Sequence, residues 1–272
     1  MAPPSEKTPK KITVPIVRET KGRRKLTMVT AYDAPSARIV DEAGIDIALV
    51  GDSLGMVIQG KPDTLSVTLE QMVYHTEMVA RSTARALVVG DMPFLSFQIS
   101  DERTLESAGR LIQAGAAAVK LEGGGKIADR IRAITEIGIP VMAHLGLTPQ
   151  SIHQMGGYKV QGRDVENARR LLDEAKRIQD AGAFAVVLEG MPASLATQMT
   201  EQLAIPTIGI GAGSHCDGQV LVFHDLVGLS GDRTPTFVRR YADLRVTAVE
   251  AVRKFKADVE AGRFPSEGES YK

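Results

Sequence analysis

The sequence has little that would link it to a membrane, to nucleic acid or to an oxidising compartment. Its single cysteine, Cys216, cannot form an internal disulfide and indicates a reducing compartment. Its 33 Lys and Arg residues balance 33 Asp and Glu residues, so no basic surplus is available to bind nucleic acid or an anionic membrane. It lacks a run of about 18 apolar residues for a membrane helix and an N-terminal secretory signal. We expect a cytoplasmic, soluble protein.

Short apolar runs recur along the chain, which is 43% hydrophobic and therefore able to form a sizeable core. They are rich in small or β-branched residues and are apolar on both faces, as expected of parallel strands that are covered on each side. The predicted strands are 26–32, 46–51, 86–90, 116–121, 140–144, 183–188, 206–210 and 219–223.

Helical patterns lie between these runs. Segments that begin at Thr68 and Ser100 carry apolar residues at helical spacing or an acidic first turn, and 164–180 reads as a long amphipathic helix. A glycine suited to a left-handed cap ends each of four predicted helices, and the next strand follows within two residues. These glycines are Gly44, Gly115, Gly138 and Gly182.

Strands that alternate with helices favour a (β/α)8 TIM barrel, and 272 residues suit a single domain of this kind. The main alternative is a doubly wound open sheet, which normally places a glycine-rich fingerprint after its first strand. Residues 30–33 (TAYD) are not such a fingerprint. We expect residues 1–24 to form an N-terminal tail and a short helix, and residues 25–272 to form the barrel with a C-terminal helix over 235–262.

Four of the predicted strands are each followed directly by an acidic residue. In a barrel, the carboxyl ends of the strands meet on the face that carries the active site. A single acid there could equally be a helix N-cap or a solvated loop residue, but four in register favour a site. Clustered carboxylates repel unless a cation neutralises them, and oxygen ligands without a Cys/His pattern favour Mg²⁺. The four acids are Asp52, Asp91, Glu122 and Glu189.

Two basic residues lie among these acids. Lys120 precedes Glu122 by two residues, so both project to the same side of a strand. It could bind a substrate carboxylate or act as a Schiff-base nucleophile, and the adjacent acids favour the first role by keeping it protonated. His144 ends the fifth strand, where it could donate to a substrate oxygen or serve as a core residue, and its position favours the first. We interpret His75 and His153 as structural.

Two glycine-rich stretches are only weak evidence for nucleotide binding. Residues 123–126 lack the spacing of a phosphate-binding P-loop. Residues 209–213 look like a dinucleotide motif but follow the seventh strand, where a loop that approaches a ligand closely, such as an anion, is the better interpretation. Ser214, His215 and Cys216 come next, and two potential ligands make a poor metal site.

At these residues the chain resembles the ketopantoate hydroxymethyltransferase family. The resemblance spans about residues 12–265, and the HLGLTPQ and GGYKVQG motifs are specific to that family. The matching motifs are 30–33, 49–55, 74–76, 90–94, 119–123, 144–150, 156–162 and 208–213. The Ser214–His215–Cys216 loop is less typical of the family, and its role stays open.

The resemblance implies a barrel of the phosphoenolpyruvate/pyruvate superfamily, a bound Mg²⁺ and a homo-oligomer, typically a decamer. Asp52 and Asp91 would bind the metal and Glu122 would support it, while Glu189 would accept a proton. The 2-oxo acid substrate would contact Asp52, Ser53, Asp91 and Lys120.

The implied reaction moves a hydroxymethyl group from 5,10-methylenetetrahydrofolate to 3-methyl-2-oxobutanoate, giving 2-dehydropantoate in pantothenate biosynthesis. Removal of the C3 proton would create an enolate, whose charge Mg²⁺ would stabilise. The reduced folate rests on the resemblance alone, since the sequence holds no separate pterin signature. The alternatives are a C–C lyase of the same superfamily, a Schiff-base aldolase that uses Lys120, and a non-catalytic barrel. A lyase would carry its cysteine in a KKCGH loop, and Cys216 lies in no such motif.

Overall fold

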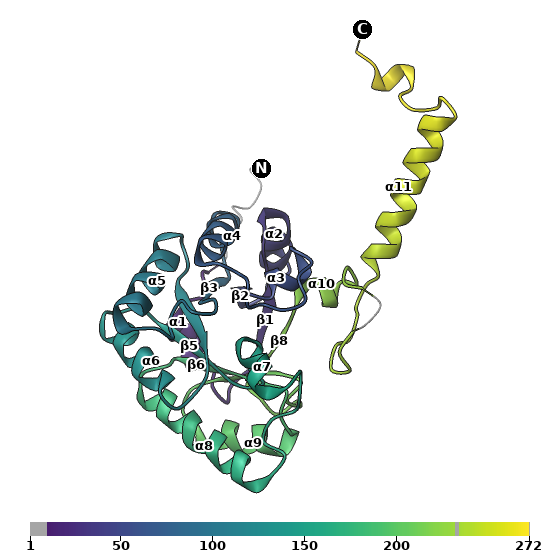
Figure 1. Cartoon of the computed structure of the whole chain (residues 1–272). Coiled ribbons are helices and arrows are strands. Elements are labelled where there is room, and N and C mark those ends of the chain that lie inside the picture. The colour runs from purple at the N-terminus through teal and green to yellow at the C-terminus, as the bar shows by residue number, and fades with distance from the viewer. Residues whose placement is uncertain (1–9, 232–233, 272) are drawn as a thin grey trace, which may run out of the picture. The chain divides into compact units, whose positions relative to one another are not determined.

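The strands form a closed parallel barrel in chain order (Figure 1), which confirms the predicted (β/α)8 fold. The computed structural model describes residues 10–231 and 234–271, and eight strands lie within them. Each predicted strand is present, with ends shifted by up to a few residues. The strands are β1 Leu26–Thr30, β2 Ile47–Val50, β3 Leu87–Asp91, β4 Ala118–Glu122, β5 Val141–Gly146, β6 Ala185–Glu189, β7 Thr207–Ile210 and β8 Gly218–Leu221.

Helices cover the outside of the barrel strands, as Figure 1 shows. Those of the barrel are α1 Val14–Glu19, α2 Ala34–Glu42, α3 Leu54–Val57, α4 Leu69–Arg81, α5 Asp101–Gln113, α6 Ile127–Glu136, α7 Ile152–Met155, α8 Val165–Asp180 and α9 Ala193–Gln202. A 3-10 turn, η1 Pro149–Ser151, precedes α7. The short helix expected near the N-terminus is α1, whereas residues 1–9 of the expected tail lie outside the described residues.

The helix boundaries follow the capping chemistry of the sequence. Thr68 caps α4 by accepting from the backbone N–H of Gln71, and Ser100 and Asp164 cap α5 and α8 in the same way. The predicted left-handed caps are confirmed, because the φ angles of the four glycines are positive. They are 75° at Gly44, 104° at Gly115, 85° at Gly138 and 101° at Gly182.

The connection between β7 and β8 departs from the expected alternation, because residues 211–217 join these strands without a helix. Gly211 and Gly213 have φ angles of 61° and 82°, and these left-handed positions interrupt any helical turn. The Lys25 ammonium donates to the carbonyl oxygen of Cys216 at 2.5 Å, which ties the end of this connection to β1. The general alternation of strands and helices therefore does not extend to this connection, where the sequence predicted a glycine-rich loop.

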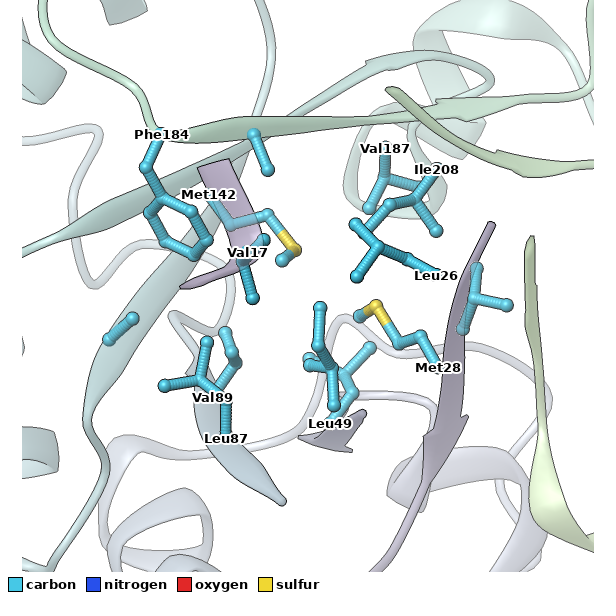
Figure 2. Packing of buried hydrophobic residues seen from close by; sticks show 14 of the residues in the cluster. Val17, Leu26, Met28, Leu49, Leu87, Val89, Met142, Phe184, Val187 and Ile208 are labelled. Atoms are coloured by element: carbon cyan, nitrogen blue, oxygen red, sulfur yellow. The ribbon is translucent and has the colours of Figure 1, made fainter. Parts of the chain in front are cut away.

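The apolar core fills the barrel at the end where the strands begin. Helix α1 closes this end, and its Val17 is fully buried against the barrel interior. Figure 2 shows Val17 together with Met28, Val89 and Met142, which come from three different strands. Burial of such side chains is the main stabilising contribution to the fold. The acids Asp91, Glu122 and Glu189 and the base Lys120 lie on strands of the same barrel, near the ends of the strands that are opposite to this core.

The chain divides into two compact units, residues 1–222 and 223–272. The second contains α10 Phe223–Leu226, α11 Leu244–Glu260 and the 3-10 turn η2 Glu267–Glu269. The helix predicted over 235–262 begins only at Leu244, so the first part of that prediction was wrong. The backbone N–H groups of Tyr241 and Leu244 bond to carbonyls of Leu226 and Val227 instead of forming helical turns. No helix of the described residues is long and apolar enough to cross a membrane.

Candidate active site

Strand register brings the predicted acids and bases to one end of the barrel. Asp91 on β3 pairs with Lys120 on β4, and Glu122 on β4 pairs with His144 on β5. Glu189 ends β6 beside Gly146 of β5. Gly146 has a φ of 96°, and a Cβ there would collide with the carbonyl oxygen of Glu189. The close approach that glycine permits therefore helps to place Glu189.

Asp91 and Lys120 form a buried ion pair. The Lys120 Nζ lies 2.6 and 2.7 Å from the two oxygens of Asp91 and 3.9 Å from an oxygen of Glu122. Burial acts to lower the pKa of Lys120, but the charges of Asp91 and Glu122 outweigh it and raise that pKa. The amine is therefore held as a cation, which supports a role in binding an anion and opposes a role as a nucleophile.

The three acids of the cluster differ in their electrostatic environment. Burial and the charges of Asp91 and Glu122 raise the pKa of Asp52 well above its usual value. Burial also raises the pKa of Asp91, although Lys120 offsets part of this effect. The pKa of Glu122 is lowered despite its burial, because His144 and Lys120 favour its charged form. The site therefore concentrates negative charge on carboxylates that the protein only partly neutralises.

His144 bridges two of the predicted acids. Its Nδ1 lies 3.3 Å from Glu122 Oε1, and its Nε2 lies 3.2 Å from Glu189 Oε2. Burial acts to lower the pKa of His144, but these carboxylates raise it to about 9. His144 and Glu122 are buried, whereas the Glu189 side chain keeps 16% of its surface exposed. Glu189 is thus the acid of this group that remains most accessible to a reactant.

Ser53 is held by a residue that the sequence analysis quoted only as part of a motif. The Tyr32 hydroxyl lies 2.8 Å from Ser53 Oγ, and Tyr32 is fully buried. The Nδ1 of His75 on α4 lies 2.5 Å from the Tyr32 carbonyl oxygen. His75 therefore has a supporting position, in keeping with its interpretation as a structural residue.

Gln150 also lies among the acids, although the sequence analysis assigned it no role. Its side chain donates to Asp52 Oδ2 and its backbone N–H donates to Glu122 Oε2, at 2.9 and 3.0 Å. A glutamine in a loop gives no signal in a search for titratable residues, so only its place in the 144–150 motif could have indicated it.

The cluster suits a magnesium ion in its chemistry. Mg²⁺ prefers oxygen ligands and usually takes one or two protein carboxylates, keeping water or substrate at its other positions. Asp52 and Asp91 are adjacent, since the backbone N–H of Asp52 lies 3.3 Å from Asp91 Oδ2. Among the described residues, no group of three or more His, Cys, Asp or Glu side chains is placed so that it could hold a metal ion, and His215 with Cys216 is part of none. A magnesium ion held by two protein carboxylates, with water or substrate at its other positions, needs no third protein ligand.

Comparisons with known proteins agree on one family. The family model for ketopantoate hydroxymethyltransferase matches residues 11–267. A 3-methyl-2-oxobutanoate hydroxymethyltransferase from Geobacter metallireducens is 55% identical over 96% of this chain and 98% of its own. A second enzyme of that name, from Geobacter sulfurreducens, is 57% identical over 91% of this chain and 93% of its own. Among solved structures, a 2,3-dimethylmalate lyase of the PEP mutase/isocitrate lyase superfamily has a TM-score of 0.62 and 19% identity, covering 97% and 93%.

Proposed function

The chain belongs to the ketopantoate hydroxymethyltransferase family, and from that premise we propose how its barrel performs hydroxymethyl transfer in pantothenate synthesis. The protein is a transferase enzyme. The proposed reaction takes the one-carbon unit of 5,10-methylenetetrahydrofolate and adds it to 3-methyl-2-oxobutanoate, giving 2-dehydropantoate. One observation carries the proposal: four strand-end acids lie with a buried lysine and a buried histidine at the barrel end where enzymes of this fold bind substrate.

Asp52 and Asp91 would hold Mg²⁺ directly, with Glu122 supporting it. This assignment is supported by their burial and by the raised pKa values of Asp52 and Asp91, since a cation would relieve the repulsion between such carboxylates. When bound, the ion supplies positive charge that stabilises negative charge developing on the oxo acid. The same two carboxylates would thereby place the metal and the substrate together.

Lys120 and Ser53 would bind and orient the oxo acid. The Lys120 ammonium has three N–H donors, of which the Asp91 oxygens engage two, and a substrate carboxylate could take the third. The Ser53 hydroxyl, held by Tyr32, could contact a second substrate oxygen. These contacts would fix C3 of the substrate relative to Glu189, and such orientation is a large part of enzymatic rate enhancement.

Glu189 would accept the C3 proton of 3-methyl-2-oxobutanoate. It is the least buried of the four acids, and the nearby Nε2 of His144, held as a cation, orients its carboxylate. His144 could also donate to a substrate oxygen. The resulting enolate carbon would attack the methylene carbon of the folate, with water supplying the hydroxyl and tetrahydrofolate leaving.

The test is exchange of the C3 proton of 3-methyl-2-oxobutanoate into D2O, followed by NMR with Mg²⁺ and without folate. We expect the wild type to catalyse exchange, and Glu189→Gln to lose it by about 10²- to 10⁴-fold while binding the oxo acid normally. Glu166→Gln, a change on the exposed surface of α8, is the matched control and should exchange at the wild-type rate. Normal exchange by Glu189→Gln would remove Glu189 as the base.

Exchange also separates the alternatives. A non-catalytic barrel would show none, and a Schiff-base aldolase would be trapped on Lys120 by borohydride and would keep its activity in EDTA. The ion pair of Lys120 with Asp91 argues against a free amine nucleophile. Loss of exchange in EDTA with recovery on adding Mg²⁺ would support the metal-dependent reaction.

We propose further that the enzyme is a cytoplasmic homodecamer, as the family resemblance implies. Sedimentation velocity of the full chain gives the mass directly. A monomer or dimer at micromolar concentration would overturn the decamer without affecting the chemistry of the barrel.

A further inference from the structure

Gln150 contacts the loops that follow β2 and β3 and the last residue of β4. It lies in η1, after β5. Its Nε2 donates to Asp52 Oδ2 after β2 and to the Met92 carbonyl oxygen after β3, both at 2.9 Å. Its backbone N–H donates to Glu122 Oε2 at the end of β4, at 3.0 Å. One buried residue therefore connects two of the proposed metal-site acids.

The orientation of the Gln150 amide is set by its partners. Both acceptors, the Asp52 carboxylate and the Met92 carbonyl, lie on the Nε2 side. On the other side, Gln98 Nε2 donates to Gln150 Oε1 at 3.1 Å. A flipped amide would place an oxygen against two acceptors and leave a donor facing a donor. Each polar atom of the side chain is thus engaged in a single arrangement.

Asp52 differs from the other two buried acids because no ion pair forms on it among the described residues, and its side-chain contact with a donor is this amide. Asp91 has the Lys120 ammonium, and Glu122 has the imidazole of His144. Among side chains of the described residues, Gln150 is the one that donates a hydrogen bond to the Asp52 carboxylate. Loss of the donor that contacts this buried carboxylate would leave the carboxylate free to rotate.

We propose that Gln150 is a positioning residue that orients Asp52 for magnesium binding and couples it to Glu122. The inference rests on the proposed function, because it concerns the acids assigned there to the metal. Gln150 would touch neither metal nor substrate. Its effect would pass through the carboxylates that it holds, in the way that hydrogen-bond partners of metal ligands commonly tune affinity.

A purely structural role for Gln150 makes a different prediction. The bonds from Gln150 to Met92 and Gln98 could simply anchor η1 to the loop after β3. In that case removal of the amide would lower thermal stability and leave magnesium affinity unchanged. Magnesium affinity measured without turnover therefore separates the two roles.

The test compares the full-length wild type with Gln150→Met and Gln98→Met by isothermal titration with MgCl2. Methionine keeps the length of the side chain but has no donor. We expect Gln150→Met to raise the Kd for Mg²⁺ by about 10- to 100-fold. Gln98→Met removes a partner of Gln150 that contacts no acid, so we expect it to change the Kd by less than about 3-fold. In assays at saturating Mg²⁺, the KM for the oxo acid should recover toward the wild-type value while kcat stays reduced.

An unchanged Kd for Gln150→Met, with a lower melting temperature, would overturn the proposal in favour of the structural role. If Gln150→Met does not fold, Gln150→Asn decides the question. Asparagine keeps the amide but is one methylene too short to reach Asp52, so the Kd should still rise, and an unchanged Kd would overturn the proposal. A wild type that binds no Mg²⁺ would instead overturn the metal assignment of the proposed function.

Discussion

At the barrel end where the strands begin, Asp46 is surrounded by donors, whereas Asp52 at the opposite end is surrounded by other acids. Asp46 accepts two hydrogen bonds from Arg24, at 2.8 and 2.9 Å, and two from the backbone and hydroxyl of Thr27, at 3.0 and 3.1 Å. Both carboxylates are buried, at 3% and 4% exposure. Burial raises the pKa of either group, yet these donors bring that of Asp46 below its usual value, whereas that of Asp52 stays well above.

Asp217 repeats the pattern of Asp46 at the start of β8. It accepts from the Lys21 ammonium at 2.7 Å and from the backbone N–H of Thr207 at 2.9 Å. Its pKa is lowered despite burial, because these donors favour the charged form. The two ends of one barrel therefore use the same residue type for different purposes. Acids with several donors join the strand starts to the loop that follows α1, and acids with few donors form the candidate site, as is common at functional sites.

The largest expected effect is that of Asp91→Ala, at the barrel end that holds the candidate site. This change would remove a proposed metal ligand and the partner of Lys120, so magnesium and oxo-acid binding should weaken together. We expect kcat/KM to fall by about 10³-fold or more, since the interactions that a metal makes with developing charge are worth several kcal/mol. Calorimetry with each ligand checks the prediction. Retention of both affinities would move the metal site elsewhere.

Asp46→Ala at the opposite end should change stability and spare the chemistry. It would leave Arg24, Arg85 and Thr27 without their shared acceptor, and loss of hydrogen bonds to a charged group costs about 1.5–3 kcal/mol. Urea unfolding measures this loss. The folded variant should bind Mg²⁺ with wild-type affinity, and a large change in that affinity would show that the two ends are coupled.

Asp52→Asn tests the difference between Asp52 and Asp46 more finely. It keeps the shape of the side chain and removes one of the carboxylates that lie near Asp91 and Glu122. We expect the metal-free variant to be about as stable as the wild type, or up to about 2 kcal/mol more stable, while magnesium binding is lost. Unfolding in EDTA tests this. A loss as large as that of Asp46→Ala would mean that Asp52 is a structural acid.

The smallest expected effect is on how the free energy of unfolding changes with pH in the acidic range. A carboxyl whose folded-state pKa is lowered stabilises the fold above its unfolded value, near 3.8, and this contribution is lost as pH falls through the folded-state value. The stability difference between the wild type and Asp46→Asn should therefore shrink as pH falls below 3.8. The pKa of Asp52 is raised, so its ionised form destabilises the fold. The stability of Asp52→Asn relative to the wild type should therefore increase as pH rises. Urea unfolding from pH 3 to 7 follows both, and parallel profiles would contradict the comparison.

Local chemistry made much of this protein predictable. The apolar runs correspond to all eight strands, and the glycines at the helix ends adopt the expected left-handed φ angles. Both signals are local, because they depend on the pattern of a few neighbouring residues. Residues two apart on a strand share a side, and this correctly placed Lys120 near Glu122, at 3.9 Å. The closer partner of Lys120, Asp91 on the neighbouring strand, did not follow from this spacing.

Other features depend on contacts that no local pattern contains. The late start of α11 arises because the backbone N–H groups of Tyr241 and Leu244 bond to the carbonyls of Leu226 and Val227. Sequence reasoning placed His144 at a strand end but did not foresee that its two nitrogens would face Glu122 and Glu189. Gln150 was missed because its importance comes only from its neighbours.

By itself, the sequence determined that four strands end in acids and that parallel strands would bring these acids to one end of a barrel. Only the tertiary structure decided which buried acids are satisfied and which are not. Asp46 and Asp52 lie on either side of one four-residue strand, and neither position in the sequence reveals its donors. The donors of Asp46 come from 22, 19 and 39 residues away and that of Asp52 from 98. The energy of a buried charge depends on such contacts through space.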